Sequence, residues 1–203
     1  MTHPRPWIVT GAMAAGKSTV CEALAQHFKR SVHLRGDIFR KMIVNGEADM
    51  GPVLTPEARA QLTLRHEIAC DAVRRYCEAD FAVVYQDVLV GPDLELVVAR
   101  LADLDPRIVV LVPDAQTLAE RDSGRAKTGY GSDFPPSVLA NAFAHETPRM
   151  GLWIDSSTMT VGDVVERILA EFGESRAGLN PDFARRCGQS SLRASVSGQE
   201  KLS

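Results

Sequence analysis

The eight residues from Gly11 to Ser18 constrain the fold of this chain more than any other segment. They read Gly-Ala-Met-Ala-Ala-Gly-Lys-Ser, which matches the phosphate-binding pattern G-x-x-x-x-G-K-[ST]. A short apolar run at 7–10 precedes the motif, and 19–30 follows it with apolar residues at helical spacing. A strand, a glycine-bounded loop and a helix N-terminus form an anion site, because backbone N–H groups and the helix dipole converge there. The motif therefore predicts a nucleoside triphosphate site.

The residue types within this P-loop predict how the triphosphate is held. Backbone N–H groups suit the β-phosphate, the Lys17 ammonium neutralises β- and γ-oxygens, and the Ser18 hydroxyl holds Mg²⁺. The residues that we expect to bind ATP here are Gly11, Ala12, Met13, Ala14, Ala15, Gly16, Lys17, Ser18 and Thr19.

Apolar strands alternate with helical patterns along the rest of the chain. The predicted strands are 7–10, 31–34, 81–85, 108–112 and 152–154, and the predicted helices are 19–30, 38–44, 55–77, 92–102, 115–122, 137–145 and 160–172. This alternation favours a three-layer α/β fold, in which helices cover both faces of a parallel sheet. We assign residues 1–173 to this domain, and the Ser-, Gly- and Arg-rich residues 174–203 to a flexible tail.

Composition narrows the class of partner. The formal net charge of −3 argues against binding of long nucleic acids by bulk electrostatics. No apolar run approaches the length of a membrane span, and the N-terminus shows no signal-peptide pattern. The four cysteines lack C-x-x-C pairing, and the five histidines (His3, His27, His33, His66 and His145) lack metal-ligand spacing, so we interpret the histidines as structural or surface residues. These features predict a reduced, cytoplasmic protein without a membrane partner.

Asp37 is the candidate catalytic base. It follows the predicted strand 31–34, and ligands of open α/β sheets lie beyond the carboxyl ends of the strands. A carboxylate there can accept the proton of a substrate hydroxyl as that hydroxyl attacks the γ-phosphate. The alternative is that Asp37 only caps the following helix. Arg40 lies close enough in sequence to hold an acceptor or phosphate oxygen, although a solvated surface position explains it equally well.

Asp87 is the candidate acidic residue on the next strand. It follows the apolar run 81–85, which is the Walker-B pattern of an acid that holds Mg²⁺. The sequence leaves open whether Asp87 binds the metal or contacts the acceptor, and many buried strands simply end in an acid. Gln86 is a further candidate for acceptor contact.

A charged, glycine-containing segment at about 123–136 is the candidate lid. Arg125 lies in this segment and Arg121 lies just before it. A guanidinium that closes over the site can stabilise the charge of the transferring phosphoryl group. The alternative is a solvated loop. We assign both arginines to the donor phosphates and Arg125 also to catalysis.

These motifs together resemble the small P-loop kinases related to adenylate, shikimate and gluconate kinases, and most of all the chloramphenicol phosphotransferase-like proteins. The resemblance spans 7–172. The segments that carry it are Gly11–Ser18, Arg35–Asp37, Gln86–Asp87, the stretch from Glu120 to Arg125, and Asp155–Thr160.

The resemblance implies a parallel sheet of order 2-3-1-4-5, a Mg-ATP donor and a small-molecule hydroxyl acceptor. It also implies that Asp37 is the base, that Arg121 and Arg125 contact the donor phosphates, and that 157–160 packs against adenine. The segment 42–65, which would help to form the acceptor pocket, matches nothing that identifies the acceptor. The acceptor is therefore left open between an antibiotic and another metabolite.

Two other functions stay open on the sequence alone. One is a polynucleotide or nucleotide-sugar kinase of related fold, and the other is an ATP-binding regulator that transfers no phosphate. A GTPase switch is disfavoured, because the chain contains no Asn-Lys pair and therefore no N-K-x-D motif. The oligomeric state is not predicted.

Overall fold

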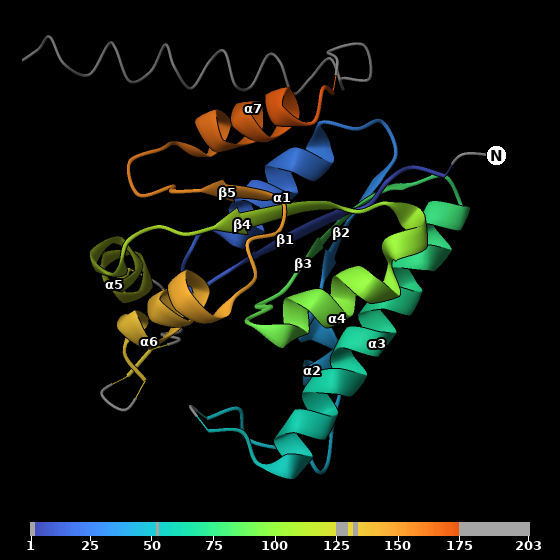
Figure 1. Cartoon of the computed structure of the whole chain (residues 1–203). Helices are drawn as coiled ribbons and strands as arrows, with labels where there is room; N and C mark the ends of the chain where they lie inside the picture. The colour runs from blue at the N-terminus through green and yellow to red at the C-terminus, as the bar shows by residue number, and fades with distance from the viewer. Residues whose placement is uncertain (1–2, 52, 125–129, 132–133, 175–203) are drawn as a thin grey trace, which may run out of the picture.

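Five parallel strands form one sheet in the order β2-β3-β1-β4-β5 (Figure 1). The computed structural model describes residues 3–51, 53–124, 130–131 and 134–174, so the predicted tail beyond Glu174 lies outside the described residues. The strands are β1 (Trp7–Gly11), β2 (Ser31–Arg35), β3 (Ala82–Gln86), β4 (Arg107–Leu111) and β5 (Leu152–Ile154). This topology confirms the α/β fold and the strand order 2-3-1-4-5.

The central strands are buried because helices cover both faces of the sheet. Every residue of β1 is buried, and Ile8 pairs with Tyr85 of β3 on one side and with Ile108 of β4 on the other. Parallel strands that are covered on both faces need near-continuous apolar runs, which is the pattern that the sequence shows. The edge strand β2 differs, since only Leu34 is buried in it.

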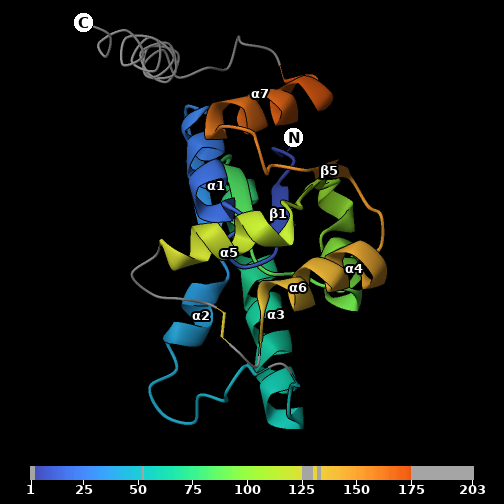
Figure 2. The same ribbon diagram turned by 90° about the vertical axis from the view of Figure 1, so that its left-hand side faces the viewer.

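The helices form two layers around the sheet. They are α1 (Lys17–Gln26), α2 (Asp37–Lys41), α3 (Pro56–Glu78), α4 (Pro92–Arg100), α5 (Ala115–Ser123), α6 (Pro136–Asn141) and α7 (Val161–Glu171), with short turns at Ala102–Leu104 and Ala142–Glu146. Helices α1 and α7 pack together on one side of the sheet, and α3 and α4 pack together on the other (Figures 1 and 2). Among the described residues, none of the helices combines the length and apolar character needed to cross a membrane.

Two helix starts follow the capping chemistry in the sequence, and a third does not. The Thr55 side chain accepts a hydrogen bond from the Ala58 N–H at 3.1 Å, and Thr160 forms a capping box with Asp163 at the start of α7. The predicted cap by Asp37 is wrong. Helix α2 begins one residue earlier than expected, so Gly36 takes the cap position and Asp37 lies inside the first turn.

Helix α1 is shorter than its apolar spacing predicts, because it ends at Gln26 rather than near Arg30. The Ser31 hydroxyl donates to the Ala25 carbonyl oxygen at 2.6 Å and closes the turn into β2. The chain must reverse here to reach the edge of the sheet, and local periodicity carries no information about that reversal.

The buried face of α3 is not the one that apolar residue type alone predicts for 55–77. Their apolar character makes Ile68 and Tyr76 candidates for burial, but they are 39% and 40% exposed. The buried positions include Leu62, His66, Ala69, Val73 and Cys77. Their spacing of three and four residues follows one stripe of the helix. His66 lies on this stripe, and its neighbour Arg65 reaches Asp87 at the carboxyl end of β3.

Candidate active site

The P-loop conformation depends on residues that tolerate left-handed backbone angles. Gly11 has φ of 149°, and a Cβ there would lie 2.4 Å from the Leu111 carbonyl oxygen, so only glycine fits against β4. Ala14 and Gly16 have φ of 60° and 90°. Successive residues that alternate between right- and left-handed angles turn their N–H groups inward, which forms a concave anion site.

Lys17 lies at the start of α1, next to this loop. Its side chain is buried, and its ammonium donates to the carbonyl oxygens of Gly11 at 2.9 Å and Ala12 at 2.8 Å. The cap residue Gly16 has no side chain to satisfy the first N–H groups of α1. The ammonium and the helix dipole therefore concentrate positive charge at one point, as a polyphosphate site requires.

Ser18 is joined to β3 by a side-chain hydrogen bond. The Gln86 amide Nε2 donates to Ser18 Oγ at 3.0 Å, so Gln86 is the β3 residue that contacts the P-loop hydroxyl. Magnesium prefers oxygen ligands and keeps several of them from phosphates and water. Within the described residues, no group of three or more acidic, histidine or cysteine side chains could hold a metal. The donor set thus fits a Mg²⁺ ion held by Ser18 together with nucleotide phosphates rather than by a protein cage.

The Asp87 carboxylate is bound on several sides by protein groups. Arg65 of α3 donates to its Oδ1 at 2.8 Å, the Val88 N–H donates to the same oxygen at 2.8 Å, and the Tyr85 hydroxyl donates to Oδ2 at 3.3 Å. His66, which burial keeps at a lowered pKa, lies 3.8 Å from Oδ2. These contacts direct Asp87 toward α3, whereas Gln86 faces the P-loop.

Asp37 lies at the start of α2, beyond the carboxyl end of β2. Burial alone would raise the pKa of its carboxyl group, but the hydrogen bond from Lys41 and the charges of Lys41, Arg35 and Arg65 outweigh burial and lower the pKa. The Arg35 Nε is 3.5 Å from Asp37 Oδ1. The carboxylate is therefore ionised at neutral pH, the state in which it can accept a proton.

Gly36, which precedes Asp37, leaves room for the Asp87 carboxylate. Its N–H donates to the Gln86 carbonyl oxygen at 2.9 Å, which continues the pairing of β2 with β3. A Cβ at this position would lie 2.1 Å from Asp87 Oδ2. A side chain here would push Asp87 out of its place, so this position requires glycine.

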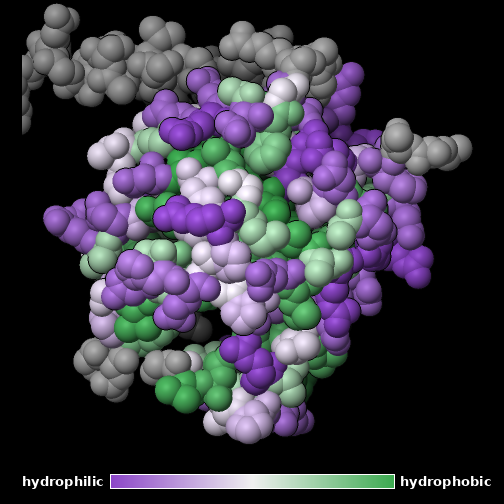
Figure 3. All heavy atoms as spheres, viewed as in Figure 1, coloured by the Kyte–Doolittle hydropathy of each residue, from purple (hydrophilic) through white to green (hydrophobic). Residues whose placement is uncertain are grey.

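One large cavity joins these groups. Its volume is about 1510 Å³, and Lys17, Ser18, Asp37 and Asp87 all line it. Figure 3 shows the surface hollowed between the α6 region and a lobe below it. That lobe is formed by α2, the following loop and the first turns of α3. The cavity therefore extends from the P-loop to this lobe, where both polar and apolar side chains line it.

The lobe contains Arg40, which lines the cavity and also anchors the loop that follows α2. Its guanidinium donates to the Ala48 carbonyl oxygen at 2.9 Å and lies 3.1 Å from Glu47 Oε1. Apolar residues that line the cavity include Met50, Leu54 and Leu62 of the lobe, together with Val88 and Val90, which follow β3.

Arg121 of α5 lies next to the P-loop. It donates to the Ser156 carbonyl oxygen at 2.8 Å, and its Nη1 lies 3.9 Å from the position of a Cβ on Gly16. The Tyr130 hydroxyl donates to the Met13 carbonyl oxygen at 2.7 Å, so a residue of the predicted lid contacts the P-loop. Arg125, the second predicted lid arginine, lies outside the described residues.

Two residues of this region had no role in the sequence-based prediction. Arg65 holds Asp87, and its position next to the buried stripe of α3 was a usable signal, because a charged side chain that is largely buried needs a partner. His33 contacts Gln86 at 2.9 Å. A search for metal-ligand spacing has no means of detecting that contact.

Replacing Arg65 with methionine is expected to destabilise the fold by about 3 to 5 kcal/mol, because it leaves the buried Asp87 carboxylate without its cation. Urea unfolding measures the loss. Arg75→Met is the matched control on the same helix, since Arg75 is 83% exposed in its pair with Glu78 and such pairs contribute about 0 to 1 kcal/mol. Adding Asp87→Asn to Arg65→Met should recover part of the loss. Equal losses in Arg65→Met and Arg75→Met would contradict the prediction.

Comparison with protein families supports a P-loop nucleotide site. A family described as an AAA domain matches residues 7–148, which is more than half of the chain and includes the P-loop, Asp37 and Asp87. Among functionally curated proteins, none matches the sequence of this chain.

Solved structures share the fold at low sequence identity. The tunicamycin resistance protein of Deinococcus radiodurans is 14% identical, with a TM-score of 0.65 over 88% of this chain and 99% of that one. A sugar kinase from a Janibacter species is 17% identical, with a TM-score of 0.60 over 87% and 99%. The APS kinase CysC of Mycobacterium tuberculosis, solved with AMPPNP and APS, is 14% identical, with a TM-score of 0.61 over 86% and 100%. The chain therefore has the fold of these proteins over nearly their full length.

Proposed function

The chain belongs to the AAA-domain family, and on that premise we propose that it is an ATP-dependent kinase that moves the γ-phosphoryl group to a hydroxyl of a small molecule. The observation that carries this proposal is the single cavity that contains both the P-loop and the ionised Asp37. A binding protein needs only the P-loop. A carboxylate beside it, with room for a second molecule, is what transfer to a hydroxyl requires.

The donor half of the proposed site binds Mg-ATP. The P-loop N–H groups and Lys17 bind the phosphates, and Ser18 would hold the Mg²⁺, which supplies charge neutralisation at the phosphate oxygens. We assign Arg121 to the donor phosphates on its proximity to the P-loop and Ser156. Arg125 keeps the role that the sequence predicts, as a lid arginine that stabilises the transferring phosphoryl group.

The acceptor half of the proposed site is the part of the cavity that α2, the following loop and the first turns of α3 line. Asp37 accepts the proton of the attacking hydroxyl, and Gln86 and Arg40 line the path to it. We place Asp87 on the acceptor side, because Arg65, Val88 and Tyr85 already bind its oxygens and orient it toward α3. The apolar residues of the lobe suit an acceptor that carries nonpolar as well as hydroxyl groups.

Two of the solved structures support this choice of chemistry by their names, a sugar kinase and an APS kinase. The tunicamycin resistance protein supports an antibiotic as one acceptor class, in agreement with the resemblance to chloramphenicol phosphotransferase-like proteins. We therefore propose antibiotics and related hydroxylated metabolites as the first acceptors to test.

An acceptor screen tests the proposal directly. The full chain is incubated with ATP, Mg²⁺ and pools of hydroxylated antibiotics, sugars, nucleosides and 5′-hydroxyl oligonucleotides, and mass spectrometry scores the gain of one phosphate. We expect a phosphorylated small molecule that depends on both ATP and Mg²⁺. Transfer only to the oligonucleotides would replace the proposal with a polynucleotide kinase. ATP binding without transfer to any pool would favour a regulator.

A further inference from the structure

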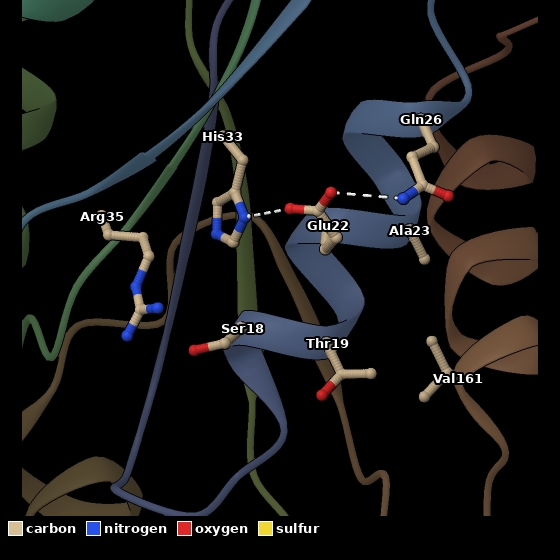
Figure 4. Close-up of a pocket in the computed structure, with 8 residues that line it drawn as sticks. All are labelled: Ser18, Thr19, Glu22, Ala23, Gln26, His33, Arg35 and Val161. Carbon is tan, nitrogen blue, oxygen red and sulfur yellow. Dashed lines mark hydrogen bonds and ion pairs between the residues drawn. The ribbon is translucent and has the colours of Figure 1, made fainter.

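A chain of side-chain hydrogen bonds leads from the exposed face of α1 to the P-loop hydroxyl. The Gln26 amide donates to Glu22 at 3.2 Å, and Glu22 contacts Nδ1 of His33 at 2.9 Å. The other ring nitrogen of His33, Nε2, lies 2.9 Å from Gln86 Oε1, and Gln86 Nε2 donates to Ser18 Oγ at 3.0 Å. Figure 4 shows the first two links, with the imidazole between Arg35 of the same strand and Glu22 of α1.

The direction of each hydrogen bond follows from the groups at the two ends. Because the Gln86 amide nitrogen faces Ser18, its carbonyl oxygen faces His33, and that oxygen can only accept. The Glu22 carboxylate at the other side of the ring also only accepts. Nε2 of His33 must therefore be the donor toward Gln86, while Nδ1 lies 2.9 Å from the Glu22 carboxylate.

We propose that His33 is a positioning residue for the Mg-ATP site: its Nε2–H holds the Gln86 amide in the orientation that donates to Ser18 Oγ. One lone pair of the hydroxyl is then taken by Gln86, and the second lone pair is left for a metal. This inference rests on the proposed function for the identity of the ligand, but the orientation of Gln86 is independent of it.

The surroundings of His33 keep the ring in place. Its side chain is 11% exposed, whereas that of Glu22 is 57% exposed. The hydrogen bond with His33, and after it the one from Gln26, lower the pKa of the Glu22 carboxyl group, so the carboxylate that His33 contacts stays ionised. The ring and Glu22 border a surface cavity of about 640 Å³, which also contains Ser18 and Arg35. Of the groups around the ring, Glu22 and Arg35 are the charged ones that line this cavity.

Removing a side chain that orients a metal ligand typically lowers metal affinity or activity by about 10- to 100-fold. Two substitutions separate the nitrogens of His33. In His33→Gln the amide nitrogen takes the place of Nε2 and can still donate to Gln86, whereas in His33→Asn it takes the place of Nδ1 and reaches only toward Glu22. Both variants are uncharged and polar, so they differ mainly in whether the new amide can donate to Gln86.

The first experiment measures ATP binding by titration calorimetry with Mg²⁺ and with EDTA. We expect His33→Asn to weaken binding about tenfold in Mg²⁺ and to leave binding in EDTA unchanged, while His33→Gln stays close to wild type in both. Equal losses in the two variants, equal losses in Mg²⁺ and EDTA, or no loss in His33→Asn would overturn the proposal.

The second experiment needs no nucleotide. Correlation of ring protons with ring nitrogens by NMR reports whether His33 Nε2 is protonated in the folded wild-type chain at neutral pH. A protonated Nε2 supports the proposed orientation of Gln86, and an unprotonated Nε2 overturns it. If the wild type binds no ATP, the proposed function fails, and this spectrum alone decides the positioning role.

Discussion

Replacing Lys17 with alanine is expected to reduce ATP binding below detection. The ammonium is buried and lies over the P-loop, within reach of the carbonyl oxygens of Gly11 and Ala12. Its removal leaves the phosphate charges with one fewer desolvated partner, which costs about 3 kcal/mol or more and therefore over a hundredfold in Kd. Titration calorimetry with Mg-ATP measures the change.

Two further variants distinguish a lost contact from a lost fold. Lys17→Met keeps most of the side-chain volume without the charge, and it should bind ATP as weakly as Lys17→Ala while unfolding in urea close to the wild type. Lys29→Ala removes the same charge from an exposed position after α1 and should leave binding unchanged. ATP affinity near the wild-type value in Lys17→Met would show that the ammonium does not bind the phosphates.

The fold was predictable where sequence and backbone are tied locally. The P-loop needs φ angles near Gly11 and Gly16 that favour glycine, and it is bounded by a strand and a helix, so its identity follows from a few residues. The buried strands have continuous apolar runs because both faces of the sheet are covered. Strand order has no such local signal, and the expectation of 2-3-1-4-5 came from the family resemblance.

Long-range partners mark the limit of that reasoning. Arg65 and Asp87 are 22 residues apart on a helix and a strand, and only the packing of α3 against β3 brings them together. The sequence leaves open whether Asp87 binds the metal or contacts the acceptor. In the structure its carboxylate is bound by Arg65 of α3, and the neighbouring Gln86 donates to Ser18. Successive side chains of a strand point in opposite directions, and the sequence does not indicate which of these two neighbours contacts the P-loop.

The predicted start of α2 was also inaccurate. The Asp37 cap was misplaced by one residue, and one residue is enough to change an N-cap into a side chain that lines the cavity. The assignment of Asp37 as a base rests on its position after β2, which does not depend on that residue, so this assignment stays a prediction that an experiment can test.

Replacing Asp37 with asparagine is expected to keep ATP binding and to slow phosphoryl transfer by about a hundredfold or more. Asparagine has nearly the same shape but cannot accept the proton of the attacking hydroxyl. Because positive groups lower the pKa of Asp37, the wild-type carboxylate stays ionised across the neutral range, and the loss should be similar at every pH there. Turnover of the acceptor found in the screen gives the rate, and calorimetry gives the ATP affinity.

The matched control for this prediction is Asp71→Asn, which makes the same change on the exposed face of α3 and should leave both rate and affinity unchanged. Asp37→Asn also weakens the ion pairs with Lys41 and Arg35, so its unfolding in urea is measured beside it. A rate that falls together with ATP affinity would indicate a role in shaping the cavity. A rate close to the wild type, with ATP still bound, would remove Asp37 from the chemistry. Water or another carboxylate in the cavity would then accept the proton, and Asp87, which lies against Gly36, is the first such carboxylate to test.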